Sequence, residues 1–319
     1  MPIQIRPTNL DTDLAALAAI TNWADRAPTS PEDMRRWLEH MPPGRIVCRL
    51  VSVDDHNAVN GYALAVHEVF SPDGYFYVWV GVNEDARGKG YGKALRDELW
   101  SFLKEQHATR LVSDAWDDDP LSLAFAERNG FRIDRHLFKS SLDLTTFDET
   151  PYVGVIDKLI REGMRFTSLA EVGDDDANRR KYHELDERVS QDIPGYDFHP
   201  IAFEEYNQRS FHSDIYRPGG RLVAVEEDRW VGYATVTLIP ANGNAHNEMT
   251  GVLREYRGRG IALALKLLAI RYARSIGARE ITTSNDSLNA PMLAINRKLG
   301  YKPQNGQYKL KNDQPVFQH

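Results

Sequence analysis

The order of hydrophobic and polar residues predicts a series of strands and helices in the first half of the chain. Alternation is typical of half-buried strands, and apolar residues three or four positions apart are typical of one helix face. On this basis we predict strands at residues 3–6, 45–53, 61–70, 75–82 and 111–115, helices starting near 13 and 31 and spanning 90–106 and 120–128, and a final strand or strand pair over 131–144.

The second half repeats this series after a polar, acidic stretch at 145–151. A helix containing Ile156 and Leu159 leads into a strand at 166–169, and strands, loop and helices then follow as before. The halves differ most at residues 174–208, which we expect to form two helices. Segments that vary between otherwise matched units are where substrate selectivity tends to lie.

The repeat is also visible residue by residue. A loop from Arg87 to Gly92 recurs as Arg257 to Ala262 (257 − 87 = 170), and Gly130 recurs at the same spacing as Gly300. Loop, helix, strand and following helix therefore recur without a net insertion or deletion. We predict two domains, 1–150 and 151–319, because 319 residues exceed one typical core.

Composition narrows the class of protein. Charged residues make up 27% and hydrophobic residues 42%, as in ordinary globular proteins, and no apolar run is long enough for a membrane span. The single cysteine, Cys48, excludes an internal disulfide and a cysteine-based metal cluster. With no signal peptide at the N-terminus, we expect a cytoplasmic protein. A net charge of −7 argues against nucleic acid as a partner.

The repeated loop has the chemistry of an anion site. A glycine loop that joins a strand to a helix directs free amide groups and the positive end of the helix dipole at one spot. Glycines let the backbone approach a phosphate closely, and each loop also carries two basic residues. The loop residues are Arg87, Gly88, Lys89, Gly90, Tyr91 and Gly92 in the first copy, and Arg257, Gly258, Arg259, Gly260, Ile261 and Ala262 in the second.

Three phosphate-loop patterns compete for this loop. A Walker loop needs a lysine followed by Ser or Thr, which neither copy has. A dinucleotide fingerprint needs G-x-G-x-x-G and an acid about 20 residues later. Asp114 meets the second requirement in the first copy, but Ser284 stands at the matching position of the second. The pattern Arg-x-x-Gly-x-Gly/Ala fits both copies in full.

That third pattern resembles the acetyl-CoA pyrophosphate loop of the GNAT superfamily of N-acetyltransferases. The order of elements agrees, and each half ends its last helix with Gly-Phe or Gly-Tyr, at Gly130 and Gly300. The resemblance covers nearly the whole chain, once per half. It implies an α+β fold of two tandem GNAT-like domains, each a mixed, mostly antiparallel sheet flanked by helices. It also implies acetyl-CoA as cosubstrate and no metal.

The resemblance favours the second half as the working site. In the superfamily, the strand before the loop separates from its neighbour and the gap receives the pantetheine arm. Gly81 and Val82 in the first half, and Gly251, Val252 and Leu253 in the second, hold that position, and a glycine suits a backbone that a ligand approaches closely. The second half adds a CoA-contacting series, Asn285, Asn289 and Asn296, whereas the first has Asp117, Asp119 and Ala126 in the equivalent places. An aspartate near a polyphosphate is unfavourable, so we expect the first half to bind CoA without turnover, or only to support the second.

Catalysis by direct attack needs a base, because a protonated amine cannot attack a thioester. The superfamily often uses a glutamate on the strand before the loop, and Glu248 holds that place; a surface acid on an edge strand explains it equally well. His246 is a lesser candidate. The tyrosine acid that many members carry is replaced by Asn296, which leaves Tyr301 or Tyr256 to protonate the leaving thiolate.

The sequence therefore predicts an N-acetyltransferase that acetylates an amine, most simply that of a small molecule, in its second domain. Two alternatives remain: a non-catalytic acyl-CoA-binding or sensor protein, and an acetyltransferase for protein or peptide amines. We expect no nucleic-acid or membrane partner. The sequence leaves the acceptor and the oligomeric state open.

Overall fold

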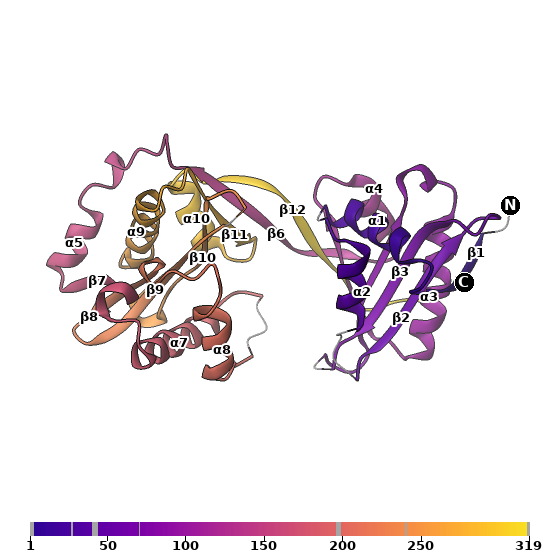
Figure 1. Cartoon of the computed structure of the whole chain (residues 1–319), viewed down its shortest axis with the longest axis horizontal. Helices are drawn as coiled ribbons and strands as arrows, with labels where there is room; N and C mark the ends of the chain where they lie inside the picture. The colour runs from indigo at the N-terminus through magenta and orange to yellow at the C-terminus, as the bar shows by residue number, and fades with distance from the viewer. Residues whose placement is uncertain are drawn as a thin grey trace. The chain divides into compact units, whose positions relative to one another are not determined.

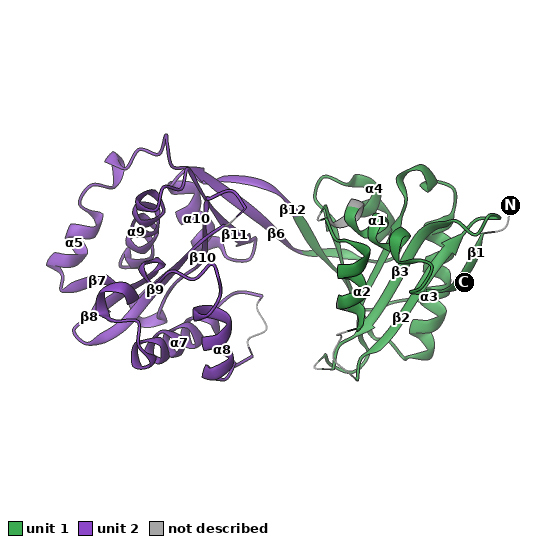
Figure 2. Ribbon diagram, viewed as in Figure 1, with its two compact units in different colours: residues 1–134, 307–319 green, residues 135–306 purple. Residues whose placement is uncertain are grey.

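The computed structural model describes residues 3–26, 28–39, 44–69, 71–195, 199–239 and 241–317, apart from the side chains of 23–25 and 37. These residues form two compact units (Figure 2). Unit 1 comprises residues 1–134 and 307–319, and unit 2 comprises residues 135–306. Each unit has the mixed α+β content expected from the sequence.

Unit 1 is a six-stranded sheet in the order β1-β2-β3-β4-β5-β12. Its pairs are antiparallel except for β4 and β5, which are parallel. Its elements are β1 (Gln4–Pro7), α1 (Leu14–Asp25), α2 (Pro31–Glu39), β2 (Ile46–Val53), β3 (Val59–His67), β4 (Tyr75–Val82), α3 (Tyr91–Glu105), β5 (Arg110–Trp116), α4 (Pro120–Arg128) and the far end of β12 (Lys302–Asn312). Residue 70, the predicted end of the third strand, lies outside the described residues.

Alternation along the strands gives the unit 1 sheet two buried faces. Val51 and Tyr62 pack against the apolar stripe of α1 and α2, while their neighbours Leu50 and Ala63 pack against α3. Side chains of consecutive strand residues point to opposite faces, so one strand supplies both cores. The α3 core includes Leu95, the first fully buried leucine after the glycine loop.

Unit 2 repeats the plan, with strand order β6-β11-β10-β9-β8-β7. Only β10 and β11 are paired in parallel. Its elements are β6 (Arg132–Asp143), α5 (Val155–Arg161), β7 (Met164–Ser168), α6 (Leu169–Val172), α7 (Asp176–Ser190), α8 (Phe203–Phe211), β8 (Arg221–Glu226), β9 (Arg229–Leu238), β10 (Ala245–Val252), α9 (Ile261–Ser275), β11 (Glu280–Asp286) and α10 (Ala290–Lys298).

The helices of unit 2 also cover both faces of its sheet. Helices α7 and α8 lie on one face and α9 on the other (Figure 1). Tyr233 of β9 packs with Val189 of α7, whereas its neighbour Ala234 belongs to the core under α9. The two helices predicted within 174–208 are therefore α7 and α8, which cover one face of the unit 2 sheet.

The compact units do not coincide with the predicted domains 1–150 and 151–319. Strand β6 belongs to the first sequence copy, yet its residues 137–143 pair with β11 of unit 2. Strand β12 ends the second copy, yet residues 307–312 pair with β5 of unit 1. The predicted boundary separates the sequence copies, but each sheet is completed by a strand of the other copy.

Most predicted elements are found within two residues of their expected ends, and β4 and α4 match at both ends. Leu169 was placed in a strand but starts the short helix α6. Strand β12 continues to Asn312, and Phe317 packs edge-on against Trp100 with ring centroids 6.2 Å apart.

Candidate active site

Each unit contains a fork between its two parallel strands. In unit 2, β10 and β11 pair only from Ala245 to Asn247, opposite 281–283, and part beyond that point. In unit 1, β4 and β5 pair only from Tyr75 to Tyr77, opposite 110–112. Beyond the fork, β4 in unit 1 and β10 in unit 2 lead into the glycine loops, as the resemblance implied.

The glycine loops end in helices that begin at the same position. Gly90 and Gly260 are the N-caps of α3 and α9, with φ angles of 93° and 91°. Side chains with a Cβ rarely adopt such angles, so glycine is required there by the backbone itself. Nothing lies within 4 Å of a Cβ added to Gly260. The first amides of each helix lack partners within the helix and can therefore bind an anion.

The glycines one residue before the strand ends serve packing rather than close approach of a ligand. A Cβ on Gly251 would lie 2.1 Å from Cγ1 of Val189 on α7. A Cβ on Gly81 would lie equally close to the ring of Trp79, its neighbour on the same strand face. These glycines make room for protein side chains on the sheet face opposite α9 and α3.

The loop arginines are already engaged with protein groups. Arg257 donates from Nε to the carbonyl of Val252 (3.0 Å) and from Nη2 to Asp192 (2.9 Å). Arg259 donates to Glu226 at 2.6 Å. Hydrogen bonding from Arg254, together with the charge of Arg257, lowers the pKa of Asp192. These side chains hold the loop in place through bonds to protein groups. Anion binding at the loop therefore depends on the backbone amides and the helix dipole.

Unit 1 has a cavity of about 810 Å³ at its fork. Its walls come from β4, the glycine loop, α3, β5 and α4, and include Val82, Arg87, Gly88, Gly90 and Gly92 of the predicted CoA site. Lys89 and Tyr91 of the same loop do not line it. The volume falls within the usual range for small-molecule sites. Asp119 caps α4 through the amide of Ser122 (3.1 Å) and lies 3.5 Å from the Arg87 guanidinium.

The three asparagines predicted to contact CoA in unit 2 have different roles. Asn296 donates to Oδ1 of Asn285 at 2.8 Å, and Asn285 in turn donates to Ser140 Oγ at 2.9 Å. Both are buried, and Oδ1 of Asn296 has no hydrogen-bond partner among the described residues. Asn289 is the N-cap of α10 and accepts from the amide of Met292. The residue of β5 that matches Asn285 is Ala115, not Asp117.

Glu248 occupies a β-bulge that unit 1 lacks. Asn247 and Met249 face consecutive residues of β9, so Glu248 between them is an additional residue in β10. Strand β4 pairs with β3 residue for residue from Val82 to Tyr77. A bulge redirects a side chain and ends regular pairing, and bulges are frequent beside active sites. This bulge adjoins the last pair of the fork, Asn247 opposite Thr283.

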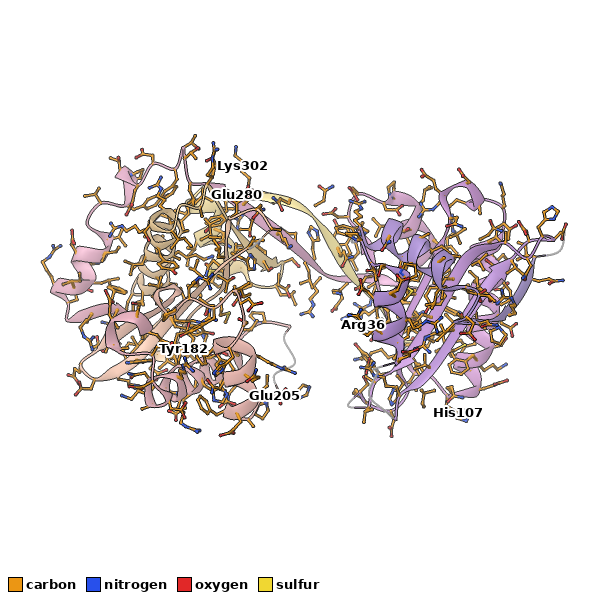
Figure 3. The ribbon with its side chains drawn as sticks, viewed as in Figure 1. Arg36, His107, Tyr182, Glu205, Glu280 and Lys302 are labelled. Atoms are coloured by element: carbon orange, nitrogen blue, oxygen red, sulfur yellow. The ribbon has the colours of Figure 1, made fainter. Side chains whose placement is uncertain are left out.

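The Glu248 carboxylate has two polar neighbours on the α7–α8 side of the sheet. Thr237 donates to its Oε1 at 3.2 Å, and Nη1 of Arg221 lies 3.8 Å from Oε2. The Glu248 side chain is 40% exposed, whereas that of Arg221 is 4% exposed. Tyr182 of α7 (Figure 3) lies on the same side of the sheet, and its hydroxyl is 2.7 Å from Thr235 Oγ1. The carboxylate is thus oriented by buried groups and remains accessible.

Tyr301 lies within the core rather than at an open surface. It is 4% exposed, and its hydroxyl has no hydrogen-bond partner among the described residues. Burial raises the pKa of this hydroxyl. His246 is half-buried and contacts Thr282 Oγ1 at 2.8 Å. Burial, then the charges of Lys139 and Lys266, lower the pKa of His246.

Leu253, which the resemblance placed at the CoA site, contributes its side chain to the core. Its side chain is buried in the core under α7, and its amide donates to the carbonyl of Val231 at 2.9 Å. Ile261 likewise has a core side chain, which leaves the start of α9 to contribute through its backbone.

Sequence reasoning missed Lys266. This lysine of α9 is 1% exposed, and its Nζ lies 5.1 Å from the ring centre of Tyr301. A lysine inside the run Leu263-Ala264-Leu265-Lys266-Leu267-Leu268 was the signal available in the sequence. Among the residues that the structure describes, no ion pair joins it to a carboxylate, and burial lowers its pKa to about 7.

The described residues hold neither a cluster of metal ligands nor a membrane-spanning helix. No cluster of three or more His, Cys, Asp or Glu side chains there has the arrangement to hold a metal ion. In that part of the chain, every helix is too short or too polar to cross a membrane.

Comparison with known proteins gives one family. The model of the acetyltransferase (GNAT) family matches twice, over residues 14–131 and 156–301. The mycothiol acetyltransferase of Saccharomonospora viridis is 28% identical over 228 residues, which is 68% of this chain and 67% of that protein.

Solved structures share the tandem fold. A GCN5-related N-acetyltransferase from Sphaerobacter thermophilus has a TM-score of 0.62 at 20% identity, covering 99% of this chain and 98% of its own. A tandem GNAT protein from the clavulanic acid biosynthesis pathway also has a TM-score of 0.62, at 21% identity, covering 99% and 100%. At these identities the likeness concerns the fold.

Proposed function

The chain belongs to the GNAT family of acetyltransferases, with two GNAT domains in tandem, and from this we propose that unit 2 acetylates the amine of a small molecule with acetyl-CoA as donor. The residues of unit 2 suit this donor. The fork between β10 and β11 would receive the pantetheine arm, and the loop from Arg257 to the start of α9 would bind the diphosphate through its amides.

The bulge at Glu248 is the observation that carries the proposal. It directs a carboxylate to the end of the fork in unit 2, and β4 of unit 1 has neither a bulge nor a carboxylate at that point. Thr237 donates to one oxygen of the carboxylate and Arg221 lies beside the other, so both groups hold the side chain in place. Only the ionised form can accept a proton from the incoming ammonium group.

The reaction then needs two contributions from this chain. Glu248 removes a proton from the amine, directly or through a water molecule, and leaves a lone pair free to attack the acetyl carbon. A backbone amide near Gly251 and Val252 donates to the carbonyl oxygen as negative charge develops there. The neutral product amide has no affinity for a base and leaves.

Glu248→Gln tests this assignment. The substitution keeps the shape of the side chain and removes the base, so we expect kcat to fall by about 10²–10⁴-fold. The assay follows CoA release with a panel of polyamines, aminoglycosides and cysteine-containing amines, and a second panel of peptide N-termini. Glu205→Gln is the matched control, because Glu205 is an exposed acid on α8 of the same unit (Figure 3). Turnover that survives Glu248→Gln contradicts the assignment.

The acceptor class follows from the relatives and is also open to test. One relative is named a mycothiol acetyltransferase, and one similar structure is that of a protein from the clavulanic acid biosynthesis pathway, so thiol-bearing amines and amines of small biosynthetic intermediates come first in the panel. The peptide panel covers protein acceptors, and activity confined to it would overturn the small-molecule proposal.

For unit 1 we propose binding of an acyl-CoA without turnover. The cavity of about 810 Å³ combines the glycine loop with aromatic walls, but no carboxylate reaches the fork from β4. Calorimetry with CoA on the Glu248→Gln protein measures the number of sites. Two sites support the proposal; one site, lost on substitution of Gly260, contradicts it.

A further inference from the structure

Lys266 is a buried cation that the proposed reaction, as described so far, does not use. Burying an amine without a carboxylate is unfavourable, and such groups are rare in cores unless they have a function. Its Nζ lies 5.1 Å from the ring centre of Tyr301. Replacement by leucine or methionine would fit the apolar run of α9, so packing alone does not explain a lysine here.

Unit 1 indicates which way this helix position faces. Arg96 lies 170 residues before Lys266, at the same turn of α3, and it lines the cavity at the unit 1 fork. Phe131 and Ala126, which match Tyr301 and Asn296, line the same cavity. By this correspondence, Lys266, Tyr301 and Asn296 occupy the positions whose unit 1 counterparts line a cavity at the fork.

The charge of Lys266 contributes, after burial and the charge of Lys139, to the lowered pKa of His246. His246 belongs to the last three paired residues of β10 before the bulge. Glu248 has its partners Thr237 and Arg221 on the α7–α8 side of the sheet, whereas Lys266 belongs to α9 on the other side. A base and a proton donor would thus approach the thioester from opposite faces.

We propose that Lys266, as an ammonium, donates a proton to the sulfur of CoA when the acetyl group is transferred. This inference rests on the proposed function of unit 2. As the amine nitrogen bonds to the acetyl carbon, the carbon–sulfur bond breaks and its electron pair stays on sulfur. One Nζ proton passes to that sulfur, and Glu248 holds the first proton taken from the acceptor ammonium group. The nitrogen loses its second proton to solvent as the neutral amide forms, and exchange with solvent restores Lys266 and Glu248.

The chemistry of the neighbouring groups favours Lys266 for this step. Asn296, at the family's tyrosine position, uses its amide to hold Asn285 and has no acidic proton to give. Burial makes the Tyr301 hydroxyl a weaker acid, whereas a lysine with a pKa of about 7 exchanges protons readily near neutral pH. Among the described residues, Tyr301 and His246 are the titratable groups that interact with Lys266, and neither carries negative charge near neutral pH.

Arg96, the unit 1 counterpart of Lys266, is consistent with a reaction that takes place only in unit 2. Arg96 donates to Oδ1 of Asn129 at 2.6 Å, and a guanidinium does not lose a proton in proteins. The same helix position thus holds a group able to give up a proton only in the unit that has the carboxylate.

Affinity labelling tests the geometry without any acceptor amine. Bromoacetyl-CoA carries an electrophile beside its sulfur, and the neutral fraction of Lys266 at slightly alkaline pH is a nucleophile within reach. We expect peptide mass spectrometry to find the label on Lys266, and excess CoA to prevent it. Labels found only on other residues would overturn the proposal, even if the protein proves to be an acetyltransferase.

Lys266→Met separates a chemical role from a structural one. We expect Tm to rise, because a buried amine is replaced by an apolar side chain of similar length, while turnover of acetyl-CoA falls on the order of 10²-fold. With an acetyl thioester whose leaving thiol has a lower pKa than that of CoA, the same substitution should reduce turnover by a smaller factor. Lys266→Arg keeps the charge but cannot give up the proton, so it should not restore turnover.

The control is Lys158→Met on α5, where the lysine is exposed and pairs with Glu162; its kinetics should match the wild type. A Lys266→Met protein with unchanged turnover, or one that loses stability and turnover together, contradicts the proposal. If the wild type acetylates no amine in either panel, the proposed function fails, while the labelling result still decides the position of Lys266.

Discussion

Gly251 carries the tightest packing constraint near the proposed site. Its neighbour Val189 would lie 2.1 Å from an added Cβ, so Gly251→Ala forces α7 away from β10. We expect a loss of about 1–3 kcal/mol in the free energy of unfolding. Chemical denaturation measures this loss. Val189→Ala in the same protein should recover part of it, and additive effects of the two substitutions would show that the contact is not the cause.

For single residues, the sequence indicated which ones belong to the candidate site better than it indicated which side chains surround them. Gly90, Gly260 and Glu248 were identifiable because loop and strand patterns are local. The environments of Gly251 and Lys266 were not, since Val189 and Tyr301 come from distant segments. A glycine before a ligand loop suggests ligand approach, but here a valine from another helix requires it.

Strand β1 and helix α1 are joined by an ion pair that is sensitive to acid. Arg6 binds Asp13 through two hydrogen bonds of 2.7 and 2.9 Å, and this lowers the pKa of Asp13. The contribution to stability is therefore complete above the usual carboxyl pKa of 3.8 and is lost as the pH falls through the lower value of the folded state.

Asp13→Asn should lower Tm by several degrees at neutral pH and by much less in strong acid, where the wild type has lost the same interaction. Thermal melts across this pH range measure the difference. A constant difference at every pH would mean that packing of Asp13, which is 2% exposed, matters rather than its charge.

Elements were the best-predicted level of the structure. Alternation and helical spacing are properties of ten or so consecutive residues, which explains why β4 and α4 matched their expected bounds. The bulge in β10 was not predictable, because the eight residues of β10 align with β4 without a gap. Its register is set by pairing with β9, a contact outside the strand itself.

At the scale of the whole molecule, the two sequence copies exchange a strand. Residues 137–143 complete the sheet of unit 2, and residues 307–312 complete that of unit 1. Fragments 1–150 and 151–319 each lack a strand that their main sheet requires. We expect neither fragment to fold cooperatively alone, and the two to regain a cooperative melt when expressed together.

Circular dichroism and thermal melts of the separate and co-expressed fragments test this. Two fragments that each fold and melt cooperatively alone would contradict the exchange. The sequence could not predict it, because the repeated copies offer each strand two nearly equivalent partners, and the choice between them depends on contacts far apart in the chain.

We propose that the glycine loops of both units bind CoA and that only unit 2 catalyses the reaction. Gly260→Ala and Gly90→Ala test it as a matched pair. Their φ angles are 91° and 93°, so each alanine costs a similar strain of about 1–2 kcal/mol, and each Cβ meets no protein atom closer than 3.5 Å. Initial rates of CoA release with an amine acceptor are the measurement. We predict that Gly260→Ala loses most of the turnover and Gly90→Ala far less; the reverse order would contradict the account.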